Sequence, residues 1–415
     1  MTQRDDLPAP PTARPGTPRR VIVASLVGTS LEWYDFFLYG TASALVFNKL
    51  FFPNFDPAVG TLLAFATYAV GFIARPLGGI VFGHFGDRVG RKQVLVVTLL
   101  IMGIATFLIG LLPTYATIGA PDRRGLNASW PQIGVPVGNL LAAGVLALLN
   151  VVLSEEAFLS WGWRVAFLLS GVLVLVGLWV RMTIAESPLF AEVEQSGAKA
   201  RLPLLEVLSQ HPKELLIAMG ARIGTDVAFY TFTLYILTFI TTNLGLPRGV
   251  GLNAVLIGSA FQLALIPLFG RLSDRIGRRP VYAAGAVSAA LWAFVFFPLL
   301  STRSTTVIVL ATIVALVTHA AMYGPQAAFI AELFSTKLRY SGASMGYQIA
   351  GVLGGGIAPL VSIALVSATG TPFAVSFYVL AMVVLTLIAL AVAPETARID
   401  LHDEPVAAQD RAGRG

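Results

Sequence analysis

The chain has 415 residues, of which 56% are hydrophobic and only 12% are charged, and its mean hydropathy is +0.77. Soluble globular domains carry about a quarter charged residues, so this composition excludes an ordinary soluble protein and indicates a membrane protein. The net charge of +6 sits in loops, which favours positive cytoplasmic loops over nucleic-acid binding, and the lack of cysteine excludes disulfides and zinc–thiolate sites.

Residues 1–20 are polar and Pro-rich, and they predict a disordered cytoplasmic tail rather than a signal peptide. Apolar runs of about 20 residues, long enough to cross a membrane, then follow one another along the chain. The sequence shows none of the short alternating segments typical of an outer-membrane barrel, so the expected fold class is an all-α membrane protein. Eleven spans are expected, near 21–47, 58–82, 93–112, 131–153, 163–182, 213–243, 249–269, 281–300, 305–331, 342–367 and 372–393.

An internal repeat divides these spans into two sets. The pattern G-x-x-x-D-R-x-G-R-[KR] occurs at 83–92 and again at 270–279, and a D-x-x-x-Y pair precedes each copy at a similar distance. Two elements that recur in the same order predict two homologous halves. The expected domains are a tail (1–20), an N-terminal helical bundle (21–182), a cytoplasmic inter-bundle loop (183–212), a C-terminal six-helix bundle (213–394) and a disordered cytoplasmic tail (395–415).

The number of spans between the two repeated loops conflicts with their charge. Both loops are basic and are expected on the cytoplasmic side, so an even number of spans must separate them, yet five are expected. The conflict falls on 113–129, which begins like an outer loop but contains the inner-loop sequence "DRRG". We infer that one span is lost between about Leu112 and Pro121 from a parent of twelve. The alternative is a neighbouring segment that fails to cross or re-enters, and the side of the membrane on which Asp122–Arg124 lies is left undetermined.

The repeated loop motif resembles the signature of the major facilitator superfamily. More narrowly, "LEWYDFFLYG", "ARPLGGIVFGHFGDRVGRK", "SWPQIGVPVG", "AELFSTKLRYSG" and "PET" are similar to the metabolite:proton symporter family. This resemblance implies a two-bundle fold, alternating access, and proton-coupled transport of a small metabolite such as proline, betaine, shikimate or a carboxylic acid. Members of that family carry a fourth span with an R-x-x-Q-G-x-x-x-G-G-E-like stretch, which this sequence lacks.

Two acids in the first span, Glu32 and Asp35, are candidates for proton coupling or substrate contact. They share one helical face, and an ionised carboxylate at the bilayer centre costs at least ~2.5 kcal/mol, so such groups normally face a cavity or a partner. The alternative is a structural ion pair with an arginine. Asp35 is favoured because Asp226 occupies the matching place in the second half.

Other polar residues within spans are candidates for the same site. Arg75 is suited to hold a substrate carboxylate or Asp35. Arg222 and Asp226, four residues apart, are expected either to neutralise each other or to bind substrate, and the pairing is at least as well supported. His319 is expected either to titrate near neutral pH or to pack in the interior. The tyrosines are expected either to line a cavity or to pack against other helices. The complete set of coupling and substrate candidates is Glu32, Asp35, Tyr39, Arg75, Arg222, Asp226, Tyr230, His319 and Tyr323.

The repeated loops are expected to form a cytoplasmic gate. Their glycines permit close helix approach, their aspartates can meet a helix N-terminus or an arginine, and their basic residues hold the loop at the cytoplasm. Simple positive-inside anchoring is the alternative, but it does not account for the repeated aspartates and glycines. The gate candidates are Gly83, Asp87, Arg88, Gly90, Arg91, Lys92, Gly270, Asp274, Arg275, Gly277, Arg278 and Arg279.

These patterns favour a secondary transporter over an enzyme. We expect a monomer in the cell (inner) membrane with both termini in the cytoplasm, whose partners are a proton, a small organic metabolite and the lipid bilayer. No cofactor, metal or nucleic acid is expected. A non-transporting remnant or membrane sensor is the alternative, because one span is missing. An ATP-driven pump or membrane enzyme is disfavoured, since the sequence has neither a G-x-x-x-x-G-K-[ST] loop nor an H-E-x-x-H pair.

Overall fold

The computed structural model describes residues 30, 33–34, 36–47, 56, 58–72, 124–169, 211–334 and 339–397. Within these ranges the secondary structure is helical, as the fold class predicts. The expected span at 93–112, the segment 113–121 and the first repeated loop lie outside the described residues.

The second half contains the six spans that the sequence predicts there. The first begins at Pro212, whose missing N–H suits a helix start, and it continues without interruption to Asn243. The others agree with the expected ranges to within a few residues, except that the second extends through the repeated loop as far as Ile276. The elements are α13 (Pro212–Tyr230), η4 (Thr231–Tyr235), α14 (Ile236–Thr238), η5 (Phe239–Asn243), α15 (Arg248–Ile276), α16 (Arg278–Ser301), α17 (Thr305–Glu332), α18 (Arg339–Ala350), η6 (Gly351–Gly356), α19 (Ala358–Thr369) and α20 (Phe373–Val392).

The described part of the first half contains two shorter apolar helices, Phe36–Phe47 and Ala58–Phe72, and one long continuous span at Arg124–Val152. That span begins earlier than the predicted residue 131. Its elements, with the short turns that follow it and the π-turn that ends the first helix, are η1 (Ser43–Phe47), α7 (Arg124–Gln132), α8 (Gly134–Val152), α9 (Glu155–Ala157) and η3 (Phe158–Gly162).

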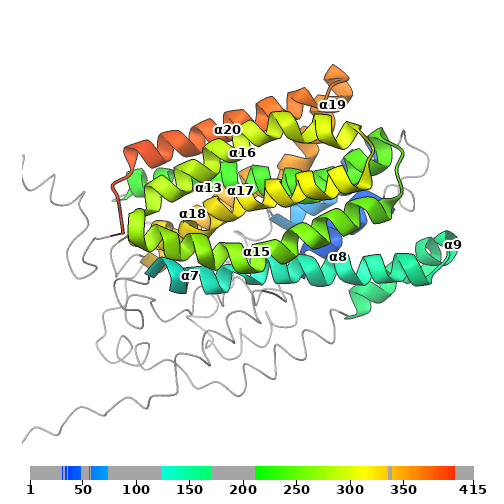
Figure 1. Cartoon of the computed structure of the whole chain (residues 1–415), viewed down its shortest axis with the longest axis horizontal. Helices are drawn as coiled ribbons and strands as arrows, with labels where there is room; N and C mark the ends of the chain where they lie inside the picture. Colours follow the sequence, from blue (N-terminus) through cyan, green and yellow to red (C-terminus); the bar gives the residue numbers. More distant parts are fainter. Residues whose placement is uncertain are drawn as a thin grey trace, which may run out of the picture.

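The long helices run side by side, and α15 lies between the two halves (Figure 1). It packs against α17 on one side and against α7 and α8 on the other. Gly277 alone joins α15 to α16, and its φ of 106° is a conformation that glycine adopts readily. We call the end that holds Asp274–Arg279 and the start of α7 the basic end, and the end that holds Leu244–Pro247 the far end.

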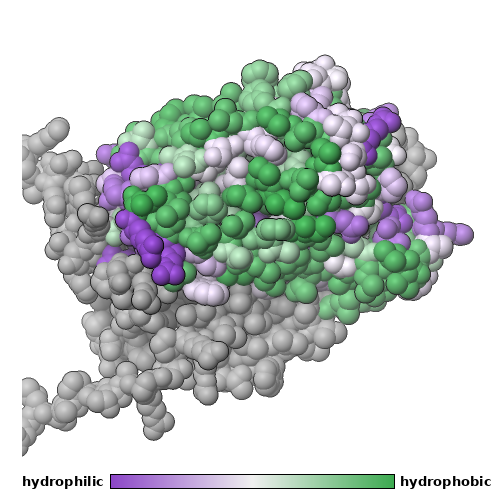
Figure 2. All heavy atoms as spheres, viewed as in Figure 1, coloured by the Kyte–Doolittle hydropathy of each residue, from purple (hydrophilic) through white to green (hydrophobic). Residues whose placement is uncertain are grey.

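The outer surface between these ends is apolar. Figure 2 shows a broad hydrophobic band on the visible face, with hydrophilic residues gathered toward the two ends. Side chains such as Leu148, Leu291 and Phe377 are exposed by 61–67% on separate helices. Exposed apolar surface of this extent is typical of lipid contact rather than of water contact, and seven helices within the described residues are long and apolar enough to cross a membrane.

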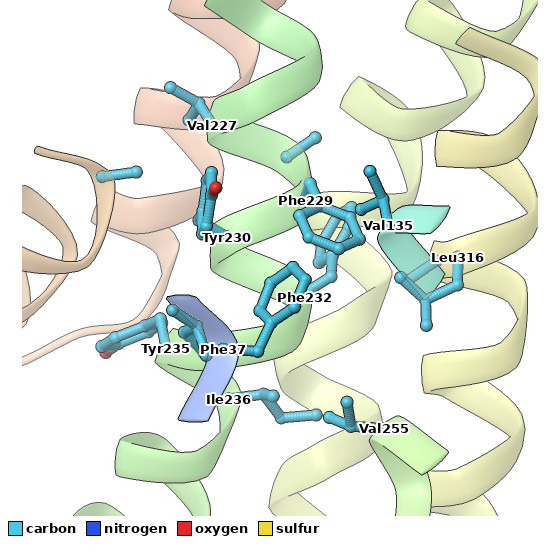
Figure 3. Packing of buried hydrophobic residues seen from close by; sticks show 14 of the residues in the cluster. Phe37, Val135, Val227, Phe229, Tyr230, Phe232, Tyr235, Ile236, Val255 and Leu316 are labelled. Atoms are coloured by element: carbon cyan, nitrogen blue, oxygen red, sulfur yellow. The ribbon is translucent and has the colours of Figure 1, made fainter. Parts of the chain in front are cut away.

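The two halves meet in an apolar core. Phe37 and Val135 of the first half lie among Phe229, Phe232 and Leu316 of the second (Figure 3), and all of these side chains are buried. Because lipid contributes no hydrophobic driving force between helices, this contact depends on close packing.

Close packing leads to a stability prediction at Gly285, where α16 approaches α17. A Cβ atom added there would lie 2.7 Å from the backbone nitrogen of Met322. Gly285→Ala should therefore lower the melting temperature of the detergent-solubilised protein, since overpacking costs about 1–3 kcal/mol. Gly144→Ala is the matched control, because its Cβ would meet only a side-chain atom of Leu256, at 3.6 Å. Equal melting temperatures for the two variants would contradict the packing described here.

Candidate functional site

A buried ion pair lies in the interior of the second half, on α13. Nε of Arg222 donates to Oδ2 of Asp226 over 2.9 Å, and each residue is only 5% exposed. The two residues are four apart on the helix, which places their side chains on one face. The neutralising pair expected from the sequence is therefore present.

Two neighbouring elements enclose this pair. The Tyr347 ring of α18 lies over the Arg222 guanidinium, with 4.0 Å from the guanidinium carbon to the ring centroid. Gly354 of η6 lies against Asp226, where an added Cβ would be 2.9 Å from the Asp226 Cβ. Nη1 of Arg222 is buried, and no atom in the described ranges is its hydrogen-bond partner. The guanidinium thus has one neutralised edge, one covered face and one donor without a described acceptor.

His319 of α17 lies close to this pair but is held by packing. Its Nδ1 accepts a hydrogen bond of 2.8 Å from Nε2 of Gln262. Its ring lies 4.5 Å from Phe229 and 5.1 Å from Tyr323, measured between centroids. Nε2 of Gln132, from the first half, donates to the Tyr323 carbonyl over 3.3 Å. A residue of each half therefore reaches this polar region.

An aromatic cluster closes the centre between the halves. Tyr230 of α13 lies with its ring centroid 5.7 Å from Phe72, 6.3 Å from Phe37 and 6.4 Å from Tyr68. Tyr39, the predicted counterpart of Tyr230, lies at the edge of this cluster, with its ring centroid 6.2 Å from that of Tyr68. Its hydroxyl donates to the Thr67 hydroxyl over 2.9 Å within the first half.

Several predicted site residues lie outside the described part of the chain. These are Glu32, Asp35 and Arg75 among the coupling candidates, and Gly83, Asp87, Arg88, Gly90, Arg91 and Lys92 among the gate candidates.

At the basic end, Asp274 joins the two halves. Its carboxylate accepts hydrogen bonds from the backbone N–H groups of Gly125, at 2.5 Å, and Leu126, at 2.8 Å, in the first turn of α7. N–H groups in a first turn have no partner within their own helix, and the helix dipole favours a negative charge there. The start of α7, including Arg124, therefore lies at the same end as the loop 270–279, as the charge argument requires for the segment before Trp130.

Arg278 stabilises the Asp274 carboxylate that makes this contact. Its Nη1 donates to Asp274 over 2.7 Å, and its Nη2 and Nε donate to the two carboxylate oxygens of Glu332 over 3.2 and 3.3 Å. The Arg278 side chain is completely buried, so two carboxylates neutralise a charge that water does not reach. Glu395 accepts hydrogen bonds from the backbone N–H groups of Arg278 and Arg279 and thereby caps α16.

The remaining gate candidates of the second loop have different surroundings. Gly270 lies directly against α7, since an added Cβ would be 2.8 Å from the Ser129 Cβ. Nη2 of Arg279 donates to the Ala391 carbonyl over 3.2 Å, whereas Arg275 is exposed. The cluster at the basic end therefore depends on Asp274 and Arg278, with Gly270 permitting the close approach.

At the far end, Arg248 makes a second contact between the halves. It is the first residue of α15, and its Nε donates to Oδ1 of Asn150 in α8. Its guanidinium lies 4.1 Å from the Phe158 ring centroid, and Nη1 is 3.9 Å from a Glu155 oxygen. Midway between the ends, Nδ2 of Asn139 donates to the Ser259 hydroxyl over 2.8 Å. Polar contacts thus join α15 to the first half at three levels, with α7 at the basic end and with α8 at the other two.

Sequence reasoning missed Tyr347, Asn139, Arg248 and Glu395. Two of these carried a recognisable signal. Asn139 is a polar residue inside an otherwise apolar span, and Glu395 belongs to the "PET" sequence that served only as a family marker. Tyr347 and Arg248 had no signal of their own, because an aromatic residue and an arginine at a span end are common in membrane helices.

Comparison with known families matches both parts of the chain. Residues 223–410 match the Major Facilitator Superfamily, and residues 20–120 match the Sugar (and other) transporter family. The shikimate transporter of Escherichia coli strain K12 is 41% identical, over 88% of this chain and 91% of the relative. The proline/betaine transporter of Salmonella typhimurium strain LT2 is 32% identical, over 95% of this chain and 87% of the relative.

The alignment with the shikimate transporter contains more positions than this chain fills. It runs over 400 positions but takes in 88% of 415 residues, so about 35 of its positions have no residue here. Among solved structures, a crystal structure of a D-xylose–proton symporter superposes with a TM-score of 0.70 at 19% identity, covering 91% of this chain and 98% of the symporter. That likeness concerns the fold.

The basic-end contact can be tested in a chain that has no native cysteine. Ser129 is completely buried beside Gly270, so a Ser129→Cys thiol should react with a maleimide only when α7 separates from α15. Adding Asp274→Asn should raise the labelling rate about tenfold or more, because hydrogen bonds to a charged group contribute about 1.5–3 kcal/mol. Arg275→Gln, on the exposed side of the same loop, is the control. An unchanged rate in Asp274→Asn would show that this carboxylate does not hold the halves together.

The far-end contact is tested in the same way with Leu146→Cys, a completely buried position on α8. Removing the Arg248 guanidinium with Arg248→Gln should raise maleimide labelling several-fold, since its contacts to Asn150 and Phe158 are lost together. Arg164→Gln is the matched control, because Arg164 also lies over a ring, that of Trp163, but within its own segment. If both substitutions raise labelling equally, the contact at Arg248 is not specific.

Proposed function

Because the chain belongs to the major facilitator superfamily, we propose that it is a secondary transporter that moves a small carboxylate or zwitterionic metabolite together with a proton by alternating access. The observation that carries this proposal is the joining of the two halves by breakable polar contacts at both ends. Asp274 and Arg248, near opposite ends of α15, each make hydrogen bonds to the first half, Asp274 to the start of α7 and Arg248 to Asn150 of α8.

Alternating access requires that one end of the contact between halves separates while the other stays closed. The contact of α15 with α7 and α8 supports this motion, because its basic-end bond to α7 and its far-end bond to α8 are separate and apolar side chains pack between the halves. This arrangement supports the gate role that we propose for the loop 270–279. By the internal repeat, we propose the same role for the loop 83–92, with Asp87 in the place of Asp274.

Proton coupling is assigned to acids within the spans. We propose Asp35, with Glu32, as the principal proton-accepting group of the first half and Arg75 as its arginine partner or a substrate contact. Asp226, its counterpart, is buried beside Arg222 in the second half. The names of the relatives, carriers of shikimate and of proline or betaine, support a substrate that bears a carboxylate.

We assign the basic end to the cytoplasm. Basic residues concentrate in cytoplasmic loops, and the repeated loops and Arg124 share that character. The chain then lies in the inner membrane with both tails on the cytoplasmic side, and it acts as a monomer.

A second candidate function is a non-transporting remnant or sensor. The observation that favours it is the set of about 35 unfilled alignment positions, since a spanning helix takes about 20 residues. We place the missing span between about Leu112 and Pro121, ahead of the start of α7 at the basic end.

Uptake into proteoliposomes with an imposed pH gradient separates the two functions. We expect gradient-driven accumulation of at least one of proline, betaine, shikimate and the di- and tricarboxylates. Asp35→Asn should abolish accumulation, because an amide does not take up the proton, and Arg75→Gln should reduce it. Full accumulation by Asp35→Asn would refute that assignment, and a wild-type protein that accumulates none of these compounds would favour the remnant.

A further inference from the structure

The hydrogen bonds of the Arg222 guanidinium are incomplete. A guanidinium carries five N–H donors in a planar fork, and buried donors in proteins almost always have partners. Asp226 accepts from Nε, whereas Nη1 is buried with no acceptor among the described residues. The Tyr347 side chain also interacts with the Arg222 guanidinium, and the Nη1 position next to it can take a further acceptor.

The surroundings restrict what that acceptor can be. Tyr347 covers one face of the guanidinium and Asp226 takes one edge, which leaves the edge at Nη1 for a planar anion. Arg222 and Asp226 together are neutral, so the region suits a ligand with a single carboxylate better than a multiply charged one. Among the described residues, the charged and titratable groups around it are Asp226, Tyr230, His319, Tyr323 and Tyr347.

The position of the pair connects such a ligand to both halves. Tyr347 lies beside Gln132 of α7 as well as beside Arg222, and Gln132 also donates to the Tyr323 carbonyl over 3.3 Å. α7 is the helix that Asp274 holds at the basic end. A ligand at Arg222 would therefore lie next to the element whose attachment closes that end.

We infer that Arg222 binds the carboxylate of the transported metabolite at its Nη1 edge, against the ring of Tyr347, and that Asp226 is the internal carboxylate with which the metabolite competes. This inference rests on the proposed transport function and assigns the carboxylate to the second half rather than to Arg75. Removal of the internal competitor should strengthen binding, and removal of the guanidinium should abolish recognition of the carboxylate.

The test compares a carboxylate with its methyl ester, which lacks the negative charge, in a binding assay. The purified protein is titrated with shikimate and with methyl shikimate, and with betaine and its methyl ester, and the shift in melting temperature reports the apparent affinity. In the wild type, the acid should bind at least tenfold more tightly than its ester in at least one pair. Asp226→Asn should bind that acid several-fold more tightly.

Arg222→Gln should lose the preference for the acid. Since this change leaves Asp226 buried and alone, the double variant Arg222→Gln with Asp226→Asn serves as the neutral, foldable form and should show the same loss. Arg222→Lys, which keeps the charge without the planar fork, should retain part of the preference. If Arg222 only stabilises the fold, its substitution should leave the ratio of the acid's affinity to the ester's affinity unchanged.

Two outcomes would overturn the inference, and they are distinguishable. If the wild type accumulates an acid in proteoliposomes and the double variant still prefers that acid over its ester, the carboxylate binds elsewhere and only this inference fails. If the wild type neither accumulates nor binds any of the acids, the proposed transport function fails and the inference fails with it.

Discussion

Polar groups in this protein are placed by the absence of water around its spans. In hydrocarbon a charged group must find a partner within the protein or line a cavity, because lipid offers none. Arg278 illustrates the constraint, since its side chain is completely buried yet contacts Asp274 and Glu332 at the same time. Arg222 follows the same rule with Asp226. The lack of water around the spans therefore accounts both for the apolar outer surface in Figure 2 and for these ion pairs in the interior.

The same constraint explains why the contact between the halves is concentrated on α15. Along this helix, the first half is joined by charge at each end and by a neutral Asn139–Ser259 hydrogen bond between them. Charged contacts lie where water can replace them when the halves separate, and the buried middle uses uncharged groups that are less costly to separate. Whether a contact between the halves is charged or neutral thus depends on its depth in the membrane.

Most of the fold could be predicted from the sequence, because spans in a membrane are long and uniformly apolar. The six spans of the second half agree with prediction to within a few residues, apart from α15, which extends beyond its apolar run because Arg271–Ile276 continue the helix at the basic end. The early start of α7 at Arg124 was not predicted, since its first residues are polar and only the contact with Asp274 shows where that helix begins.

The site was predicted only in part, for a physical reason. The neutral pairing of Arg222 with Asp226 follows from their spacing on one helix, whereas the cover from Tyr347 depends on how α18 packs against α13, which spacing within one helix does not reveal. The D-x-x-x-Y repeat had suggested equivalent tyrosines. Tyr230 lies between the halves while Tyr39 bonds within its own half, because each tyrosine responds to its neighbours rather than to its position in the repeat.

The single residue between α15 and α16 has a mechanical consequence. Because only Gly277 separates them, the basic ends of α15 and α16 must stay next to each other when either helix moves. The Glu395 hydrogen bonds hold the chain that follows α20 at the start of α16, so the basic ends of three helices are linked. A displacement of Asp274 is therefore passed to the neighbouring ends of α16 and α20 through these links.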